Sequence, residues 1–218
     1  MIDPQAVAER VQEIRSDITS ITSSNVAIVA VTKTFGHDAI RAAFSAHCDA
    51  VGENYTQELL GKAAEAPIEL PVHFIGAIQS NKVRQLAPIV AVWQGVDRIS
   101  VVHELVKRAP GAQILLQVNS TGEASKSGVP PTEVESLLAS AVDAGLNVRG
   151  LMTIGPTSGN AIEARKAFSS LRSLADSLAL PECSMGMSDD YRLAVECGST
   201  MIRIGSRLFG ARPSAQSF

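Results

Sequence analysis

A single lysine follows directly on a run of β-branched and small apolar residues, VAIVAVTK, over residues 26–33. Such a run is typical of a strand buried on both faces, so Lys33 is expected at the end of that strand. Partial desolvation lowers the pKa of a lysine, and its neutral amine then forms Schiff bases with carbonyl compounds. The alternative is an ordinary strand-end lysine whose ammonium group extends into solvent. Position alone does not decide between the two.

A second set of candidate residues lies in the run MIRIGSRLFG, over residues 201–210. Arg203 stands inside an otherwise apolar strand pattern, and Gly205 and Ser206 follow where a helical turn is predicted. Free backbone N–H groups at a helix start bind phosphate well, and a nearby glycine permits close approach. The run therefore predicts an anion site. The alternative is an ordinary glycine turn, with Arg203 paired to a carboxylate in the core.

The segment SMGMSDDYRLA, over residues 184–194, supplies a third set. Ser188 precedes a predicted helix, where a serine either caps the helix or donates a hydrogen bond to a bound phosphate. Met185 and Met187 are suited to filling space beside a flat ring, although both types are also common in protein cores. The segment is compatible with either a binding site or a plain helix start.

His73 lies early in the predicted strand over residues 72–76, where a lone histidine is more often a hydrogen-bonded core residue than a ligand. Neither the histidines nor the three cysteines show metal-ligand spacing. The cysteines are odd in number and lack a C-x-x-C motif, so a disulfide framework is not expected either. We predict no metal site.

Eight predicted strands, each followed by a helical pattern, position these residues. The strands cover residues 26–33, 49–54, 72–76, 89–95, 113–119, 147–154, 183–188 and 200–205. Alternating β and α segments indicate a parallel sheet, and eight such units favour a closed (β/α)8 TIM barrel, in which functional residues gather at the carboxyl ends of the strands. An extra helix is predicted over residues 4–23. We expect one domain, residues 1–218, with an open doubly wound sheet as the alternative.

Composition narrows the classes of function. The chain has 218 residues, 45% of them hydrophobic, and a net charge of −3, so neither disorder nor a basic nucleic-acid surface is expected. No apolar run approaches the ~20 residues that a membrane crossing needs, and the N-terminal stretch is not a signal peptide. We therefore expect a cytoplasmic protein without nucleic-acid or membrane partners.

The order of several motifs along the chain is more specific than any one of them. AVTKTF, VGENYTQE, HFIGAIQSNK, SKSG, RGLMTIG, SMGMSDD and TMIRIGSRLFGAR together resemble the family of pyridoxal 5′-phosphate (PLP) homeostasis proteins. That family is similar to the N-terminal barrel domain of alanine racemase. The resemblance runs from about Val26 to Arg212, which is nearly the whole chain.

The resemblance implies a role for each candidate residue. Lys33 would hold PLP as a Schiff base, Arg203 would face the pyridine nitrogen, and the phosphate would lie against Ser188 and the Gly205-Ser206 backbone. The remaining members of the cofactor-binding set would be Asn54, His73 and Met185.

The family likeness also bears on activity. In alanine racemase a second base, a tyrosine, comes from a C-terminal domain that this sequence does not show. Arg203 cannot protonate the pyridine nitrogen as an aspartate partner would, which makes the ring a poor electron sink. We expect a non-catalytic PLP carrier, a monomer, with PLP-dependent apo-enzymes as candidate partners. The alternatives are a small amino-acid racemase that uses Lys126 or Lys82 as second base, and an aldolase-type barrel.

Overall fold

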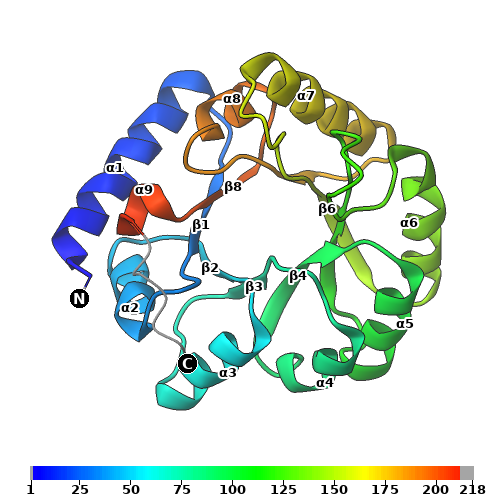
Figure 1. Cartoon of the computed structure of the whole chain (residues 1–218), viewed down its shortest axis with the longest axis horizontal. Helices are drawn as coiled ribbons and strands as arrows, with labels where there is room; N and C mark the ends of the chain where they lie inside the picture. The colour runs from blue at the N-terminus through cyan, green and yellow to red at the C-terminus, as the bar shows by residue number, and fades with distance from the viewer. Residues whose placement is uncertain (1, 212–218) are drawn as a thin grey trace.

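Eight short strands rich in β-branched residues pair in sequence order to form a closed parallel barrel. Figure 1 shows the strands as an inner ring with the helices packed around it. The last strand, β8 (Met201–Ile204), pairs with the first, β1 (Ala27–Val31), and this pairing closes the ring. The predicted (β/α)8 barrel is confirmed and the open sheet is wrong. The computed structural model describes residues 2–211.

The other strands are β2 (Ala50–Glu53), β3 (Val72–Phe74), β4 (Val90–Val96), β5 (Gln113–Gln117), β6 (Asn147–Met152) and β7 (Glu182–Ser184). The α-helices are α1 (Pro4–Ile21), α2 (His37–Ser45), α3 (Thr56–Glu65), α4 (Val83–Leu86), α5 (Ile99–Arg108), α6 (Val134–Asp143), α7 (Ala161–Ser177), α8 (Tyr191–Glu196) and α9 (Ser206–Phe209). Two 3-10 helices, η1 (Ser80–Lys82) and η2 (Pro131–Glu133), precede α4 and α6.

The main hydrophobic core lies between the barrel and the surrounding helices, because each helix turns one apolar face toward the strands. Two smaller groups of buried side chains are separate from that core; they consist of Val29, Ala50 and Met201, and of Val92, Leu115 and Met152. These side chains belong to strand faces that point away from the helices. They fill the inside of the barrel, so the barrel is packed rather than hollow.

The extra helix predicted over residues 4–23 is confirmed as α1. It begins after Asp3, whose carboxylate accepts hydrogen bonds from the backbone N–H groups of Gln5 and Ala6. Its apolar face packs against α2, α8 and α9. Figure 1 shows α1 along the outside of the barrel, beside the element that follows β8.

Seven of the eight predicted strands end earlier than their apolar patterns indicated, and two of these differences affect the site. The first ends at Val31, because Thr34 has a left-handed backbone (φ 70°) and turns the chain, so Lys33 lies in the turn beyond the strand. The strand predicted over residues 183–188 is β7, which ends at Ser184; Gly186 (φ 95°) starts the loop that contains Ser188. Both residues thus project from loops, where they have more freedom of direction than on a strand.

Within residues 2–211, no helix combines the length and the hydrophobicity that a bilayer crossing requires. The same part of the chain contains no group of three or more His, Cys, Asp or Glu side chains arranged to hold a metal ion. Residue 1 and residues 212–218 of the predicted domain, including Arg212 of the last motif, lie outside the described residues.

Close packing at the carboxyl end of β3 leads to a stability prediction. A Cβ atom added to Gly76 would lie 2.2 Å from the carbonyl oxygen of Asn54, so the two chain segments would have to separate. We expect Gly76→Ala to lower the free energy of unfolding by about 1–3 kcal/mol in urea denaturation. The control is Gly61→Ala in α3, where a Cβ meets nothing within 4 Å and alanine favours the helix. Equal effects of the two substitutions would contradict this account.

Candidate functional site

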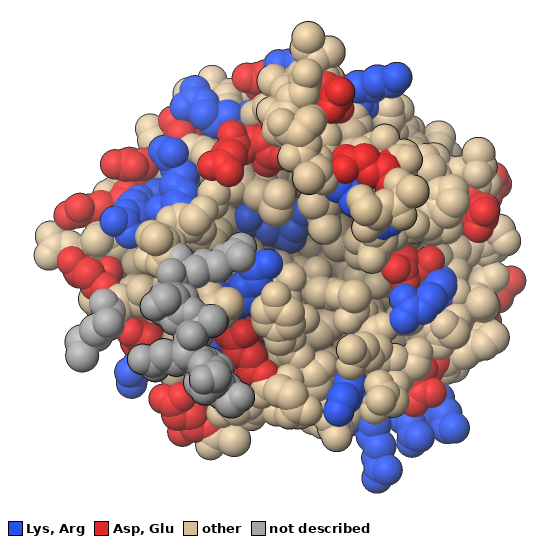
Figure 2. All heavy atoms as spheres, in the orientation of Figure 1, with Lys and Arg blue, Asp and Glu red and all other residues tan. Residues whose placement is uncertain are grey.

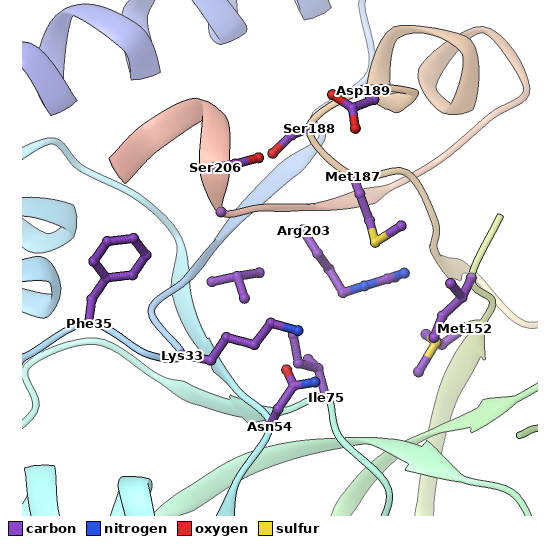
Figure 3. A pocket seen from close by; sticks show the side chains of 13 residues that line it. Lys33, Phe35, Asn54, Ile75, Met152, Met187, Ser188, Asp189, Arg203 and Ser206 are labelled. Atoms are coloured by element: carbon purple, nitrogen blue, oxygen red, sulfur yellow. The ribbon is translucent and has the colours of Figure 1, made fainter. Parts of the chain in front are cut away.

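A cavity of about 250 Å³ opens at the carboxyl ends of the strands. Small-molecule pockets usually range from about 300 to 1,000 Å³, so it suits one compact ligand. Six of the eight residues predicted to bind a cofactor line it: Lys33, Asn54, Ser188, Arg203, Gly205 and Ser206. Figure 3 shows the side chains of Lys33, Asn54 and Arg203 and of the two serines, which point into the barrel mouth from both sides. Residues from motifs far apart in the sequence therefore lie together in one cavity.

Lys33 is half-buried, and its side chain extends into the cavity with the nitrogen toward Asn54 (Figure 3). The turn that holds it is fixed on both sides. Before it, the Thr32 hydroxyl donates to Glu53 Oε1 at 2.6 Å; after it, the Thr34 backbone N–H donates to Glu58 Oε1 at 2.5 Å. Two carboxylates, on β2 and α3, thus hold the turn from which the Lys33 side chain extends.

A second lysine, which the sequence analysis did not single out, holds those carboxylates together. Lys62 Nζ lies 2.6 Å from Glu53 Oε1, 2.6 Å from Glu58 Oε1 and 2.8 Å from the Thr32 carbonyl oxygen. We call Thr32, Glu53, Glu58 and Lys62 the Lys62 network. Burial raises the pKa of Glu53, and the nearby Lys62 charge opposes that rise. The network is a buried ion pair beneath the candidate Schiff-base lysine.

Arg203 forms part of the cavity wall on β8, and its guanidinium group is almost fully buried. It donates to Ser184 Oγ at 2.7 Å and to the Thr153 carbonyl oxygen at 2.7 Å. Burial lowers the pKa of Arg203 to about 10, and the charge of Asp190 acts in the opposite direction. The group remains a cation at neutral pH. The alternative that it pairs with a core carboxylate is wrong, since it bonds to neutral oxygen atoms and no carboxylate of the described residues forms an ion pair with it.

The loop after β7 meets the start of α9 at the cavity edge. Ser188 Oγ accepts a hydrogen bond from the Arg207 backbone N–H at 3.2 Å, and Figure 3 shows the hydroxyl groups of Ser188 and Ser206 pointing toward one another. The residue that precedes α8 is Asp190, so the alternative that Ser188 caps this helix is wrong. Two hydroxyl groups and the first-turn amides of α9 together form a cluster of hydrogen-bond donors.

Asn54 has a buried side-chain oxygen, Oδ1, with no hydrogen-bond partner among the described residues. Such an atom loses its hydration without compensation unless a ligand or water supplies a donor. Three apolar side chains of the cavity wall, Ile75, Met152 and Met187, are absent from the predicted cofactor-binding set, although Met187 was noted as suited to the face of a flat ring. Each lies within a motif that was noted, but only the fold shows which of their faces reach the cavity.

His73 and Met185, the other two predicted residues, are buried outside the wall of the cavity. His73 Nδ1 lies 2.7 Å from Gln94 Nε2, and burial lowers the pKa of His73 to about 4. Met185 joins the main core, and Met187, two residues later, takes the position at the cavity. Their predicted contact with the cofactor stays a prediction.

Basic side chains lie at the cavity, although the molecule as a whole has no excess of positive charge. Figure 2 shows Lys and Arg atoms beside a hollow near the centre of the face in view, with acidic and basic side chains mixed around it. The whole chain has a net charge of −3. An anion held here is thus held by local donors and not by a general positive field.

Comparison with known proteins gives the family. A family model described as the alanine racemase N-terminal domain matches residues 2–213. A relative from Pseudomonas aeruginosa named "Pyridoxal phosphate homeostasis protein" is 41% identical over 215 residues, covering 94% of this chain and 93% of that protein. This chain belongs to the pyridoxal phosphate homeostasis protein family. The resemblance drawn from the motifs is confirmed.

Solved structures agree with this membership. PipY from Synechococcus elongatus, solved with PLP bound, has a TM-score of 0.83 and 33% identity, and covers 94% of this chain and 100% of that one. Alanine racemase from Corynebacterium glutamicum has a TM-score of 0.76 at 16% identity, over 95% of this chain and 60% of that one. The second likeness shows the fold alone.

The side chains that a racemase would need as second base lie elsewhere in this family member. Tyr191 is buried and donates to Asp17 of α1, whereas Tyr55 directly precedes α3 and is exposed. Lys126 pairs with Glu123 at 2.7 Å, and Lys82 ends η1. None of these four candidates lines the cavity formed by the described residues.

The Lys62 network generates a stability prediction. Lys62→Met would leave a buried Glu53 carboxylate without its counter-charge, so we expect the free energy of unfolding to fall by about 3–5 kcal/mol. Replacing both residues, with Glu53→Gln added, should restore much of the loss because no charge then stays buried. The control is Arg165→Met, which breaks the exposed ion pair with Glu196 and should change little. Urea denaturation of the four proteins measures this; similar losses for Lys62→Met and Arg165→Met would contradict it.

Proposed function

We propose that this chain binds PLP reversibly as a Schiff base on Lys33 and serves PLP homeostasis rather than catalysis. One observation carries the proposal: a single cavity brings the half-buried Lys33 together with a buried arginine and a cluster of serine hydroxyls. The name of the Pseudomonas aeruginosa relative and the PLP in the PipY structure support the same ligand.

The residues present fit the chemical groups of PLP one by one. Lys33 supplies the amine for the aldehyde, and Arg203 supplies a donor for the pyridine nitrogen. Ser188, Ser206 and the backbone at Gly205 supply donors for the phosphate. The unpartnered Oδ1 of Asn54 offers an acceptor, and the apolar side chains at the cavity suit the faces of the ring.

Bound PLP supplies an aldehyde that condenses with an amine, and an electron sink whose strength depends on protonation of its ring nitrogen. The chain determines that protonation through Arg203. A guanidinium has donors and no acceptor, and this one stays charged because its pKa, about 10, lies well above neutrality. It therefore donates a hydrogen bond to the ring nitrogen and does not protonate it. A neutral ring is a weak sink, which favours holding PLP over carbanion chemistry.

The proposal extends to the cellular location, the oligomeric state and the partners of the protein. The free thiols of Cys48, Cys183 and Cys197 fit a reducing compartment, so we place the protein in the cytoplasm. There it would act as a monomer, with PLP-dependent apo-enzymes as the recipients of PLP. Sedimentation of the holo-protein, alone and mixed with such an apo-enzyme, tests both statements.

The identity of the reactive lysine is open to a direct test. After incubation with PLP and reduction with borohydride, mass spectrometry should locate a pyridoxyl group on Lys33. Lys33→Ala should lose both the adduct and the Schiff-base absorbance, because no other lysine of the described residues lines the cavity. Lys82→Ala and Lys126→Ala are the controls and should keep both. An adduct that persists at full yield in Lys33→Ala would refute the assignment, and an absence of any PLP absorbance would favour the aldolase-type alternative.

The choice between carrier and racemase depends on turnover. We expect the holo-protein to convert L-alanine and other L-amino acids to D-isomers no faster than free PLP does, because the described residues that line the cavity include neither a tyrosine nor a lysine other than Lys33. Chiral chromatography of the reaction mixture measures this. Robust formation of a D-isomer that Lys126→Ala abolishes would instead establish the racemase.

A further inference from the structure

A chain of buried side chains runs from Arg203 into the interior of the barrel. Arg203 donates to Ser184 Oγ at 2.7 Å, and Ser184 Oγ donates to Gln94 Oε1 at 2.7 Å. Gln94 Nε2 then lies 2.7 Å from His73 Nδ1. All four residues are at most 6% exposed. The cavity wall is thus connected by hydrogen bonds to a histidine on the far side of the barrel interior.

The chain links strands that are not neighbours. Ser184 is on β7 and Gln94 on β4, with β5 and β6 between them in the barrel order, so their bond crosses the interior. The surrounding side chains are apolar, and Gln94 Nε2 has one further contact among them, with Met201 Sδ at 3.1 Å. A hydrogen bond in such surroundings keeps its geometry, because a polar group that loses its partner there has no water molecule to bond instead.

The direction of every bond in the chain follows from the arginine. A guanidinium only donates, so Ser184 Oγ must accept from Arg203 and turn its own hydrogen toward Gln94. The amide of Gln94 then presents its oxygen to Ser184 and its nitrogen to His73, which accepts at Nδ1. His73 is neutral in this arrangement, consistent with a pKa lowered to about 4 by burial.

The acceptors that Arg203 bonds in the barrel wall are neutral, so its positive charge stays available to a ligand in the cavity. Ser184 Oγ and the Thr153 carbonyl fix two of its N–H groups, and no carboxylate among the described residues forms an ion pair with it. The guanidinium therefore cannot rotate freely. Its remaining N–H groups therefore point in one direction. This direction determines how well they align with an acceptor atom of a flat ligand in the cavity.

We propose that Ser184 and Gln94 are positioning residues that aim Arg203 at a heteroaromatic ring nitrogen, with His73 as the fixed end of the chain. The inference rests on the proposed function, because PLP supplies that nitrogen. It gives His73 an indirect role in place of contact with the cofactor. The chain selects ligands whose ring has an acceptor at this position over ligands of the same shape without one.

The test compares PLP with its carbocyclic analogue, in which the ring nitrogen is replaced by C–H. Equilibrium dialysis gives the Kd of each, and their ratio measures recognition of the nitrogen. We expect Ser184→Ala and Gln94→Met to reduce the preference for PLP by about tenfold, which is the usual effect of a hydrogen bond to a charged group. Ser184→Thr keeps the hydroxyl and should retain the preference of the unsubstituted protein.

Ser199→Ala is the matched control. Ser199 is also a buried serine near β7 and β8, and it donates to backbone carbonyl groups without touching Arg203. We expect it to leave the ratio unchanged even where it lowers stability. Equal weakening of both ligands in Ser184→Ala and Gln94→Met would overturn the inference, since that pattern marks a merely structural role. If the unsubstituted protein forms no Lys33 adduct at all, the proposed function itself fails, and that outcome is distinct.

Discussion

The ion pair between Lys62 and Glu53 is the interaction on which the cavity depends most. Both groups are almost fully buried, and a buried charge that loses its partner is strongly destabilising. The pair connects the end of β1 to the end of β2, since Lys62 also binds the Thr32 carbonyl. The next residue of the chain after each connected position, Lys33 and Asn54, lines the cavity. One buried ammonium on α3 thus positions two side chains of the site.

The opposite wall of the cavity is held from outside the barrel. Arg10 of α1 donates to the Leu208 carbonyl oxygen at 2.7 Å, which fixes the end of α9. Asp17 of the same helix bonds to Tyr191 and Arg192 at the start of α8. The extra N-terminal helix therefore connects the two elements beside the serine cluster. The barrel closes without any strand pairing from α1. The helix instead holds in place the part of the wall where the hydrogen-bond donors converge.

Local sequence patterns were sufficient for the barrel and for most of the cavity, and long-range pairing explains the rest. The alternating β-branched runs predicted all eight strands, and six of eight site residues converge as expected. Lys62 was missed because a lysine on an amphipathic helix is normally a solvated residue; its partner Thr32 is 30 positions away. Likewise, no local signal reveals that His73 bonds to Gln94, which is 21 positions along the chain. Which residues pair across strands is decided by the three-dimensional register.

Two buried cations in this molecule show how structural and ligand-binding charges differ. Lys62 has carboxylates of Glu53 and Glu58 at 2.6 Å, so its charge is neutralised within the fold. Arg203 is equally buried, yet its bonds go to a hydroxyl and a carbonyl, and among the described residues the charge that stabilises its cationic form is that of Asp190. Burying a cation without full compensation is unfavourable by itself. The arrangement becomes favourable when a ligand brings acceptors to the cavity, so Arg203 couples the stability of this barrel to the binding of its ligand.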